Sequence, residues 1–589
     1  MINYKNRILN YANFLCKINN IERTNVSDKK ILDHIYKSDQ IILVVIIIFL
    51  TVLDFFTLLF FFSFFSTLKH SSRIKILRLF KPLNFVINKI NDFILIIISF
   101  HQFGDETVNN LPIPKKNQES RDELEFVVVG SGPSGSVVAN ELNKYFRGKV
   151  TIIEKGDNYS LPKSKHPGEE FSNKWFRGGL NSTYFREMVA FSSASCFGGG
   201  SEINSGLYHE PDESFFNNWK NEFNTSFFEF NKNIQYIEKV RTLVNYQAIN
   251  DNIFYKKILD NKNNDNQEFS ILKKFISTNN NKNSMTRTLL AEFLDNNGKI
   301  LLNTSVDKIK FIDNQWRLEL QSNGKKSFIY TKNLFLCCGS IFTNMLLLKS
   351  NISSDKKHIL KKFSFHPMIK AAALYDENVQ DLNEDVISLQ NMKFYPKFIF
   401  GNATSSLQFI LSSFYSNKKM RDFIKLNWKK MKIFHATFSL GVGKIVMVPF
   451  LKYPILFYYL TNTEKNKMVI GYRELIKFIK KAGAKKFLPI GSNSSQNFFD
   501  YSHDSDCISN LNNIKSLQVS SVHILGGVTM GESSKCVADS FGKIKSCNNL
   551  YVVDSSLINT KLLKNPQGTV MMLAYRNIDY FIKNYLKEK

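Results

Sequence analysis

The sequence lacks the cysteine patterns of disulfide scaffolds and of zinc sites. Its 589 residues include seven cysteines, an odd number, and no two of them form a CxxC pair. Disulfide frameworks use even numbers of cysteines, and structural zinc sites use closely spaced pairs. We therefore expect neither a disulfide scaffold nor a bound metal. The same usage fits a reducing compartment, and we expect the catalytic part in the cytoplasm.

Acidic residues are scarce compared with basic ones. Lys and Arg number 78 and Asp and Glu 51, which gives a formal net charge of +27. A basic chain can bind nucleic acid or an anionic membrane surface. Here the lysines are scattered and no dense basic arm stands out, so we expect no nucleic-acid partner. Hydrophobic residues at 43% and charged residues at 22% exclude a disordered chain and a polytopic transporter.

Charge is nearly absent from residues 41–68, where Asp54 is the one charged side chain. At 1.5 Å per residue, such a run exceeds the roughly 30 Å hydrocarbon core of a bilayer. Two interpretations stay open: membrane attachment, and a buried helical hairpin broken near Asp54. The basic and apolar stretch 71–90 fits an interfacial helix, whereas the apolar run 93–100 is too short to span. A removed signal peptide is disfavoured because forty mostly polar residues precede the run.

Glycine spacing after residue 123 predicts a dinucleotide-binding unit. A buried strand, FVVV, leads into Gly130, Gly132 and Gly135, then a helix and a second strand that ends at Glu154. In this pattern the glycines permit a tight turn, access for a pyrophosphate and close helix–strand packing. Glu154 can accept hydrogen bonds from the adenosine ribose. This segment alone leaves FAD and NAD open.

Three later segments carry further signals. CFGGGSEINSGLYHE, at 196–210, is either a loop where backbone approaches a ligand or an ordinary glycine-rich turn. Residues 331–350 predict a buried strand, a break at a glycine and a helix. Near the C-terminus a strand ends at Asp554 and a helix begins near Gln567. Asn565 therefore lies close to a helix N-terminus, where the electron-rich edge of a flavin would be stabilised.

Taken in this order, the motifs resemble the glucose–methanol–choline (GMC) family of FAD oxidoreductases. VVVGSGPSGSVVANEL with IIEKG resembles its FAD motif, and FGGGSEINSG its GG-x-S-x-x-N loop. LCCGSIFTNMLLLKS resembles a further family motif, and HILGGVTMG, NLYVVDSSLI and NPQGTVMML resemble its C-terminal catalytic block. The tail is most similar to cholesterol-oxidase-like members. Departures include Cys337 and Cys338 for an alanine pair, Ser555 for a glycine and Asn559 for a proline.

The resemblance implies an FAD-dependent oxidoreductase that oxidises the CH–OH group of an alcohol. A base takes the hydroxyl proton while hydride passes to flavin N5; by motif match the base is His523 and its partner Asn565. The substrate is lipid-like, sterol-like or a sugar, and the electron acceptor is oxygen, a quinone or a carrier protein. The alternatives are a lyase or isomerase of the same family, a non-catalytic membrane-anchored flavoprotein and an NAD-dependent enzyme. His366, before a proline, is read as structural or as lining the substrate pocket, and His503 as solvated.

The resemblance also implies the residues that hold FAD. We expect FAD to be bound non-covalently, because no histidine lies in the segment Met188–Gly200. Asp554 is expected at the ribityl chain or pyrophosphate, and the backbone of Val306 at the adenine. The expected cofactor residues are Gly130, Gly132, Gly135, Glu154, Gly199, Gly200, Ser201, Asn204, Val306, Asp554, Asn565, Pro566 and Thr569.

The expected fold is α/β (α+β overall). A Rossmann-like FAD-binding domain is joined to a discontinuous substrate-binding domain that contains a β-sheet, and an apolar helical extension precedes both. The expected parts are residues 1–103 for the extension and possible membrane anchor, 104–122 for a polar linker, 123–210 with 285–350 and 515–589 for the FAD-binding domain, and 211–284 with 351–514 for the substrate-binding domain.

Overall fold

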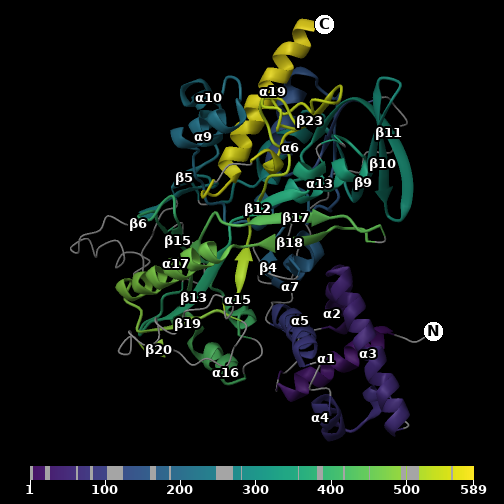
Figure 1. The fold of residues 1–589 in the computed structure, drawn as a ribbon, viewed down its shortest axis with the longest axis vertical. Helices are drawn as coiled ribbons and strands as arrows, with labels where there is room; N and C mark the ends of the chain where they lie inside the picture. The colour runs from purple at the N-terminus through teal and green to yellow at the C-terminus, as the bar shows by residue number, and fades with distance from the viewer. Residues whose placement is uncertain are drawn as a thin grey trace.

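The computed structural model (Figure 1) places two sheet-based units side by side and a helical extension beside them. The predicted linker and His503 lie outside the residues that it describes. Those residues are 4–19, 21, 27–61, 64–79, 84–102, 124–159, 167–184, 187–246, 269–279, 281–353, 355, 357–380, 389–414, 418–449, 451–491, 499–500, 517–558 and 562–588.

The first unit is built on the predicted strand–turn–helix–strand segment. Strand β1 (Leu124–Val129) leads into α6 (Pro133–Tyr145), and the chain returns as β2 (Val150–Ile153), parallel to β1. On its other edge β1 pairs in parallel with β11 (Lys325–Leu336). The seven-stranded sheet has the order β8-β2-β1-β11-β10-β9, with β23 beside β11. The remaining strands are β8 (Lys299–Leu301), β9 (Thr304–Ile312), β10 (Gln315–Ser322) and β23 (Leu550–Val552).

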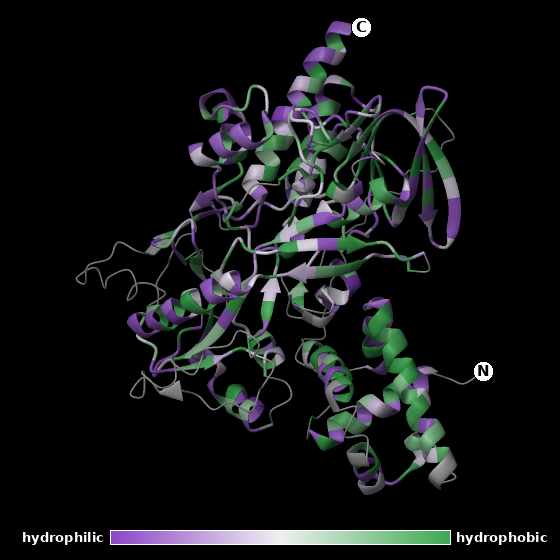
Figure 2. Cartoon of the chain, viewed as in Figure 1, coloured by the Kyte–Doolittle hydropathy of each residue, from purple (hydrophilic) through white to green (hydrophobic). Residues whose placement is uncertain are grey.

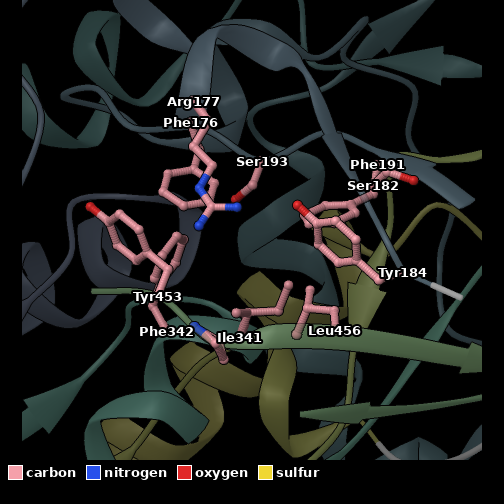
Figure 3. A pocket seen from close by; sticks show the side chains of 11 residues that line it. Phe176, Arg177, Ser182, Tyr184, Phe191, Ser193, Ile341, Phe342, Tyr453 and Leu456 are labelled. Atoms are coloured by element: carbon pink, nitrogen blue, oxygen red, sulfur yellow. The ribbon is translucent and has the colours of Figure 1, made fainter. Parts of the chain in front are cut away.

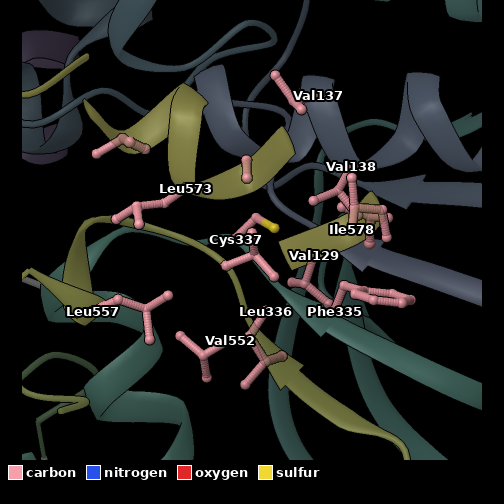
Figure 4. Packing of buried hydrophobic residues seen from close by; sticks show 14 of the residues in the cluster. Val129, Val137, Val138, Phe335, Leu336, Cys337, Val552, Leu557, Leu573 and Ile578 are labelled. Atoms are coloured by element: carbon pink, nitrogen blue, oxygen red, sulfur yellow. The ribbon is translucent and has the colours of Figure 1, made fainter. Parts of the chain in front are cut away.

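Apolar side chains bury this sheet on both faces. Residues Phe126–Val129 of β1 are all buried, as expected for a central parallel strand. Helices α6, α13 (Ser340–Lys349) and α19 (Gln567–Glu588) supply the facing side chains. Figure 4 shows these layers meeting, with Val138 of α6 and Ile578 of α19 close to Phe335 of β11. Shorter helices near this unit are α7 (Pro167–Lys174), α8 (Gly200–Ile203), α12 (Leu289–Asp295) and α14 (Lys357–Leu360).

The second unit is a ten-stranded, mostly antiparallel sheet. Helix α17 (Asn462–Lys481) packs on it and begins with a capping box between Thr461 and Glu464, which satisfies two free backbone N–H groups. The strand order is β3-β4-β21-β13-β16-β15-β14-β6, with β19 beside β13 and β20 beside β19. The strands are β3 (Asn181–Ser182), β4 (Val189–Phe191), β6 (Phe269–Ile271), β13 (Met368–Leu374), β14 (Leu389–Asn391), β15 (Ile399–Ala403), β16 (Met431–Thr437), β19 (Lys486–Pro489), β20 (Phe499–Asp500) and β21 (Val519–Ser521).

A small sheet joins the two units. Its order is β18-β17-β12-β22, and β12 (Lys362–Phe365) pairs with β22 (Ile524–Leu525), so that Phe365 faces Ile524. This register brings together two chain segments about 160 residues apart in sequence. Its other strands are β17 (Val442–Val446) and β18 (Ile455–Tyr459). Elsewhere, β5 (Asn245–Tyr246) and β7 (Lys273–Lys274) form a separate pair, and α15 (Leu407–Ser412) and α16 (Lys418–Asn427) pack against the ten-stranded sheet.

Two stretches lie on the other side of the expected domain limits. Helices α9 (Glu213–Phe223) and α10 (Phe230–Arg241) pack in the core of the first unit, where the fully buried Trp219 donates a hydrogen bond to the Met530 carbonyl at 3.0 Å. Strands β3 and β4 instead extend the second sheet. Burial of large aromatic side chains places α9 and α10 in the first unit, and backbone pairing places β3 and β4 in the second. Both depend on contacts between residues far apart in the sequence.

The N-terminal extension is a cluster of five helices with its own apolar core. They are α1 (Tyr4–Ile18), α2 (Asp28–Lys37), α3 (Gln40–Phe61), α4 (His70–Leu79) and α5 (Asn84–Gln102). Helix α3 runs unbroken through Asp54, so the helix break of the buried-hairpin interpretation does not occur there. The apolar run 93–100 forms the second half of α5. Among the described residues, α3 is the one helix long and apolar enough to cross a membrane, and a third of its apolar window is buried in the protein.

Polar contacts dock this extension onto the first unit. His34 of α2 hydrogen-bonds the Gly178 carbonyl through its Nε2 at 2.8 Å, and Lys37 donates to Asn173 at 3.0 Å. Asp39, fully buried, forms an ion pair with Arg177. Because the charges in this last pair are buried together, each depends on the other for its stabilisation.

Asp54, in the middle of apolar helix α3, is also paired. Its carboxylate forms an ion pair with Arg7 of α1 and accepts a hydrogen bond from the Phe65 backbone N–H at 3.0 Å. Both side chains are at least 85% buried. The charge therefore lies on the inner side of α3, against the other helices of the extension.

Arg7→Met is expected to lower the free energy of unfolding by about 3 kcal/mol, because it leaves a buried carboxylate without its counter-ion. Urea unfolding followed by circular dichroism measures this. The matched control is Lys583→Met, which removes the exposed pair with Asp579 and costs about 0.5 kcal/mol. Equal small losses in both variants would show that the Arg7–Asp54 pair contributes nothing to the extension.

Candidate active site

The turn between β1 and α6 has no room for side chains at two of its glycines. Gly130 has φ +102°, and a Cβ there would lie 2.5 Å from the Cys337 carbonyl oxygen. At Gly135 a Cβ would lie 1.9 Å from the Gly130 oxygen. Gly132 differs, since its nearest neighbour would be the Gly199 Cα at 4.0 Å. Gly130 and Gly135 therefore permit close packing. Gly132 faces open space at the N-terminus of α6, where phosphate binds in such turns.

Ser131 ties this turn to two other predicted segments. Its backbone N–H and its hydroxyl donate to the Glu154 carboxylate at 2.9 and 2.7 Å, and its Oγ accepts from the Gly198 N–H at 3.0 Å. The other oxygen of Glu154 accepts from the Gly156 N–H at 2.8 Å. Burial raises the pKa of Glu154, and these donors oppose that shift. The predicted ribose-binding carboxylate is thus already oriented by the protein.

The glycine-rich loop after Cys196 lies against the same turn. A Cβ at Gly199 would come within 2.6 Å of the Gly132 Cα, whereas at Gly200 it would meet nothing within 4 Å. Ser201 donates to the Gly198 carbonyl at 2.7 Å and accepts from the Met285 N–H at 3.0 Å. This loop is therefore fixed from within and leaves Gly200 facing open space, as a cofactor cradle requires.

Asn204, at the end of the loop, reaches the start of α19. Its amide donates to the Gln567 side chain at 2.6 Å and its oxygen accepts from the Gly206 N–H at 3.0 Å. In the first turn of α19, the buried hydroxyl of Thr569 has no hydrogen-bond partner among the described residues. Pro566 precedes the helix. An unpaired buried hydroxyl beside free helix N–H groups fits a bound polar ligand.

Asp554 is held by four donors from the protein. One of its oxygens accepts from the Gly339 N–H at 2.9 Å and the Thr343 hydroxyl at 2.5 Å, and the other from the Ser556 N–H and hydroxyl at 2.8 and 2.5 Å. Burial raises its pKa, against the effect of these donors. The carboxylate therefore joins β23 to the glycine turn before α13. A Cβ at Gly339 would meet nothing within 4 Å, so this turn also opens onto free space.

Val306 lies near the start of β9 and pairs with Leu320 of β10. Just before it, the Thr304 N–H donates to the Glu154 carbonyl at 2.9 Å and the Asn303 N–H to the Gly156 carbonyl at 3.1 Å. These bonds join the start of β9 to the backbone that follows β2, and the contact of Val306 with adenine stays a prediction. The glycine turns, the orphaned Thr569 hydroxyl and Glu154 together form a set of donors and open positions that fits a dinucleotide.

His523 lies between β21 and β22 and is paired with a second histidine. Its Nδ1 is 2.9 Å from the Nδ1 of His366, and the two rings meet edge-on with centroids 5.0 Å apart. His366 follows β12, so the β12–β22 pairing creates this contact. Of the two interpretations from sequence, the structure places His366 beside the predicted base.

Two more histidines, the buried His209 and the partly buried His435 of β16, lie near enough to His523 to lower its pKa. The Nδ1 of His209 accepts a hydrogen bond from the Asn565 backbone N–H at 3.0 Å, and this bond brings the second predicted catalytic residue to the cluster. Neither His209 nor His435 is predicted as a site residue from the sequence; the position of His209, five residues after Asn204, is the available signal for one of them.

Burial keeps this cluster uncharged. It lowers the pKa of His209 and His366 to about 4, and that of His435 to about 3. The pKa of His523 lies well below its ordinary value because of burial first and the neighbouring histidines second. A neutral His523 at pH 7 has a lone pair available to accept a proton.

A separate pocket lies where the extension meets the two sheet units (Figure 3). The Arg177 side chain enters it from one side, and Tyr184 and Leu456 stand across from Phe176 and Tyr453. Behind the aromatic wall, the buried ammonium of Lys155 has no hydrogen-bond partner among the described residues, and burial lowers its pKa to about 7. The rings of Phe176, Phe342 and Tyr453 lie 4.6, 4.9 and 4.4 Å from the Lys155 Nζ.

Comparison with known proteins identifies the family. Sequence profiles of the GMC oxidoreductase N- and C-terminal domains match residues 125–368 and 452–574, together more than half of the chain. The chain belongs to the GMC oxidoreductase family. The first profile match ends just after His366, and the second includes His523 and Asn565.

This GMC oxidoreductase resembles both named and uncharacterized relatives. It is 25% identical to an uncharacterized GMC-type oxidoreductase of Sinorhizobium fredii, over 80% of this chain and 97% of that protein. It is also 25% identical to a long-chain-alcohol oxidase of Arabidopsis thaliana, over 43% of this chain and 35% of that protein.

Solved structures confirm the expected α/β fold. Pyridoxine 4-oxidase from Mesorbium loti superposes with a TM-score of 0.60 at 13% identity, covering 78% of this chain and 99% of that one. Formate oxidase from Aspergillus oryzae gives a TM-score of 0.60 at 13% identity, covering 80% and 100%. At these identities the likeness shows the fold alone.

Asn559, one of the departures from the family pattern, lies outside the described residues.

Gly135→Ala is expected to weaken FAD binding tenfold or more. The added methyl would overlap the Gly130 carbonyl and push α6 away from β1, and overpacking of this kind costs about 1–3 kcal/mol. Flavin absorbance per protein after purification and titration with FAD measures the loss. Gly324→Asn, at an exposed turn with φ +78° and nothing within 4 Å of a new Cβ, is the control, because Asn tolerates this left-handed backbone; it is expected to keep its flavin.

Proposed function

We propose that this GMC oxidoreductase uses FAD to oxidise the CH–OH group of an alcohol. The single observation that carries the proposal is the neutral, paired His523 beside the elements that form the cofactor cradle. FAD supplies a two-electron acceptor for such a reaction when it is bound. The glycine turns at Gly132, Gly200 and Gly339 are the proposed places of its closest backbone contacts.

The geometry of the histidine pair limits which ring nitrogens of His366 and His523 can carry protons. Two Nδ1 atoms 2.9 Å apart share one proton, so one ring donates and the other accepts. The buried Nε2 of His366 makes no hydrogen bond to the described residues, and the proposal places its proton there, in the direction that the Leu562 backbone favours by raising the pKa of this ring. His366 then accepts at Nδ1, and His523 donates from its Nδ1.

In this tautomer the Nε2 of His523 carries a lone pair. That atom has no partner among the described residues, so it is free to take the hydroxyl proton of an alcohol. The charge that His523 gains is shared with His366 through the Nδ1 contact. Asn565 is proposed to hold the substrate oxygen, since its backbone is fixed by His209 at 3.0 Å.

A lipophilic alcohol is the proposed substrate class. The pocket of Figure 3 is lined mainly by aromatic and aliphatic side chains, and its Phe191 lies 5.6 Å from the ring of Phe365, the chain neighbour of His366. Apolar linings suit ligands of this kind, and the space here, about 10 Å³, would have to widen to admit one. A long-chain-alcohol oxidase among the relatives agrees with this class, and the tail resemblance to cholesterol-oxidase-like proteins makes sterols the next choice.

Anaerobic titration of the holoprotein with a panel of long-chain alcohols, sterols and sugars tests the function. We expect a lipophilic alcohol to bleach the oxidised-flavin absorbance band. His523→Ala is expected to retain its flavin but to slow bleaching by roughly 10²–10⁴-fold, the usual contribution of a general base. His70→Ala, an exposed histidine of the extension, is the matched control and is expected to match the wild type.

Other outcomes of this titration would replace the proposal. A flavin that no alcohol bleaches favours a lyase, an isomerase or a binding protein that holds FAD without turnover. Bleaching by sugars alone would keep alcohol oxidation and reject the lipophilic substrate. Bleaching at the normal rate by His523→Ala would remove His523 from its role as the base.

FAD is proposed to be held without a covalent bond. No histidine lies in the segment Met188–Gly200, which borders the cofactor cradle. Precipitation of the holoprotein with acid is expected to release all flavin into the supernatant, as measured by fluorescence. Flavin that stays with the pellet after washing in denaturant would show a covalent link.

A further inference from the structure

The extension presents one unpartnered apolar surface, the outer face of α3. The side chains of Val44, Ile48, Val52 and Phe55 recur every three or four residues, so they form a stripe along one side of the helix. Phe55 is 67% exposed, Ile48 56% and Val44 52%. Figure 2 shows α3 as a nearly continuous hydrophobic ribbon.

The rest of the described surface has no comparable group of exposed apolar side chains. Other large exposed apolar residues are scattered singly over the sheets and helices, which is normal for a soluble protein. A contiguous exposed apolar surface marks an interaction site instead. The outer face of α3, as used below, consists of Val44, Val45, Ile48, Val52, Phe55 and Leu58, all within one stretch of 15 residues.

The inner face of α3 excludes a membrane-spanning arrangement. Ile46, Phe49 and Leu53 are buried against the other helices of the extension, with the ring of Phe49 5.6 Å from that of Tyr11 in α1. Asp54 of α3 forms an ion pair with Arg7 of α1. If α3 crossed a bilayer, α1 would have to enter with it and carry charged side chains into hydrocarbon, which is costly.

Charge around the outer face fits an anionic surface. Between residues 40 and 79 the one acidic side chain is Asp54, which is buried on the inner side. The same stretch carries Lys69, Arg73, Lys75 and Arg78 in addition to His70, and Lys69 and Lys75 are exposed. An apolar stripe followed directly by basic side chains is the pattern of helices that lie in the headgroup region of a membrane.

We propose that the N-terminal extension is a monotopic membrane-binding module, which lays the outer face of α3 flat into the interface of a bilayer that contains anionic lipids. The module would hold the enzyme at the surface without crossing it. This proposal does not depend on the substrate, because it rests on the extension alone.

Vesicle flotation of the detergent-free holoprotein tests the surface. Wild type is expected to float with vesicles of phosphatidylcholine and phosphatidylserine in equal parts. The double variant Ile48→Glu with Phe55→Glu is expected to partition roughly a hundredfold more weakly, because it removes two inserted side chains. The matched control, Leu426→Glu with Val442→Glu, changes two exposed apolar residues outside the extension and is expected to float like the wild type.

Unchanged flavin absorbance shows that each variant is folded. Absence of wild-type flotation, or equal flotation of the Ile48→Glu/Phe55→Glu variant, would overturn the proposal. So would a wild-type dimer that this variant dissociates while no form binds vesicles, since the face would then join two copies of the chain. Loss of flotation leaves alcohol titration unaffected, so failures of the two proposals are distinguishable.

Depth measurement separates a flat helix from a spanning one. Val44 and Phe55 are eleven residues apart, or about 16 Å along α3. We expect Val44→Trp and Phe55→Trp, after subtraction of the native tryptophan signal, to be quenched equally by lipids brominated near the headgroup. Quenching of one position by bromine at the chain end and of the other near the headgroup would show a spanning helix and contradict the flat arrangement.

Discussion

The close approach of three backbone segments at Gly130, Gly135 and Cys337 is the constraint on which the cofactor unit depends. No Cβ fits between β1 and α6 at Gly135 or between β1 and the end of β11 at Gly130. Contact at this distance brings the N-terminus of α6 to the carboxyl edge of the sheet. From there Ser131 reaches both Glu154 and Gly198, so the order of the glycine-rich loop follows from the same turn.

A second constraint, the β12–β22 pairing, carries that order to the proposed catalytic histidines. Phe365 pairs with Ile524 in antiparallel register, so the next position, His366, stands opposite His523. Their Nδ1 atoms lie 2.9 Å apart. Both strands are short, and the Gly526 carbonyl after β22 accepts hydrogen bonds from the Ser340 hydroxyl and the Asn344 amide. Asp554 accepts from the Gly339 N–H and the Thr343 hydroxyl, at the start of the same helix. The glycine turns and the histidine pair thus share one hydrogen-bonded frame, and a shift in either unit moves His523.

Sequence patterns predicted the elements whose structure depends on residues close together in the chain. The strand–turn–helix unit around Gly130 follows from spacing alone, and the helix that begins at Gln567 follows from the asparagine and proline before it. The partner of His523 could not be predicted in this way, because His366 reaches it through strand pairing across about 160 residues. The place of α9 and α10 depends likewise on where Trp219 is buried. The roles of the site residues named from the motifs stay predictions.

Composition also leaves open which side of an apolar helix faces outward. In the sequence, Asp54 counts against a membrane contact, yet its pairing with Arg7 turns the charge inward and leaves the outer face without any. The extension is fixed to the enzyme by another close approach, since a Cβ at Gly178 would lie 2.5 Å from the His34 ring. The next residue back, Arg177, pairs with Asp39 and also enters the aromatic pocket. The orientation of the extension is therefore set by the same segment that shapes the pocket, so a surface that holds α3 also fixes the direction in which that pocket faces.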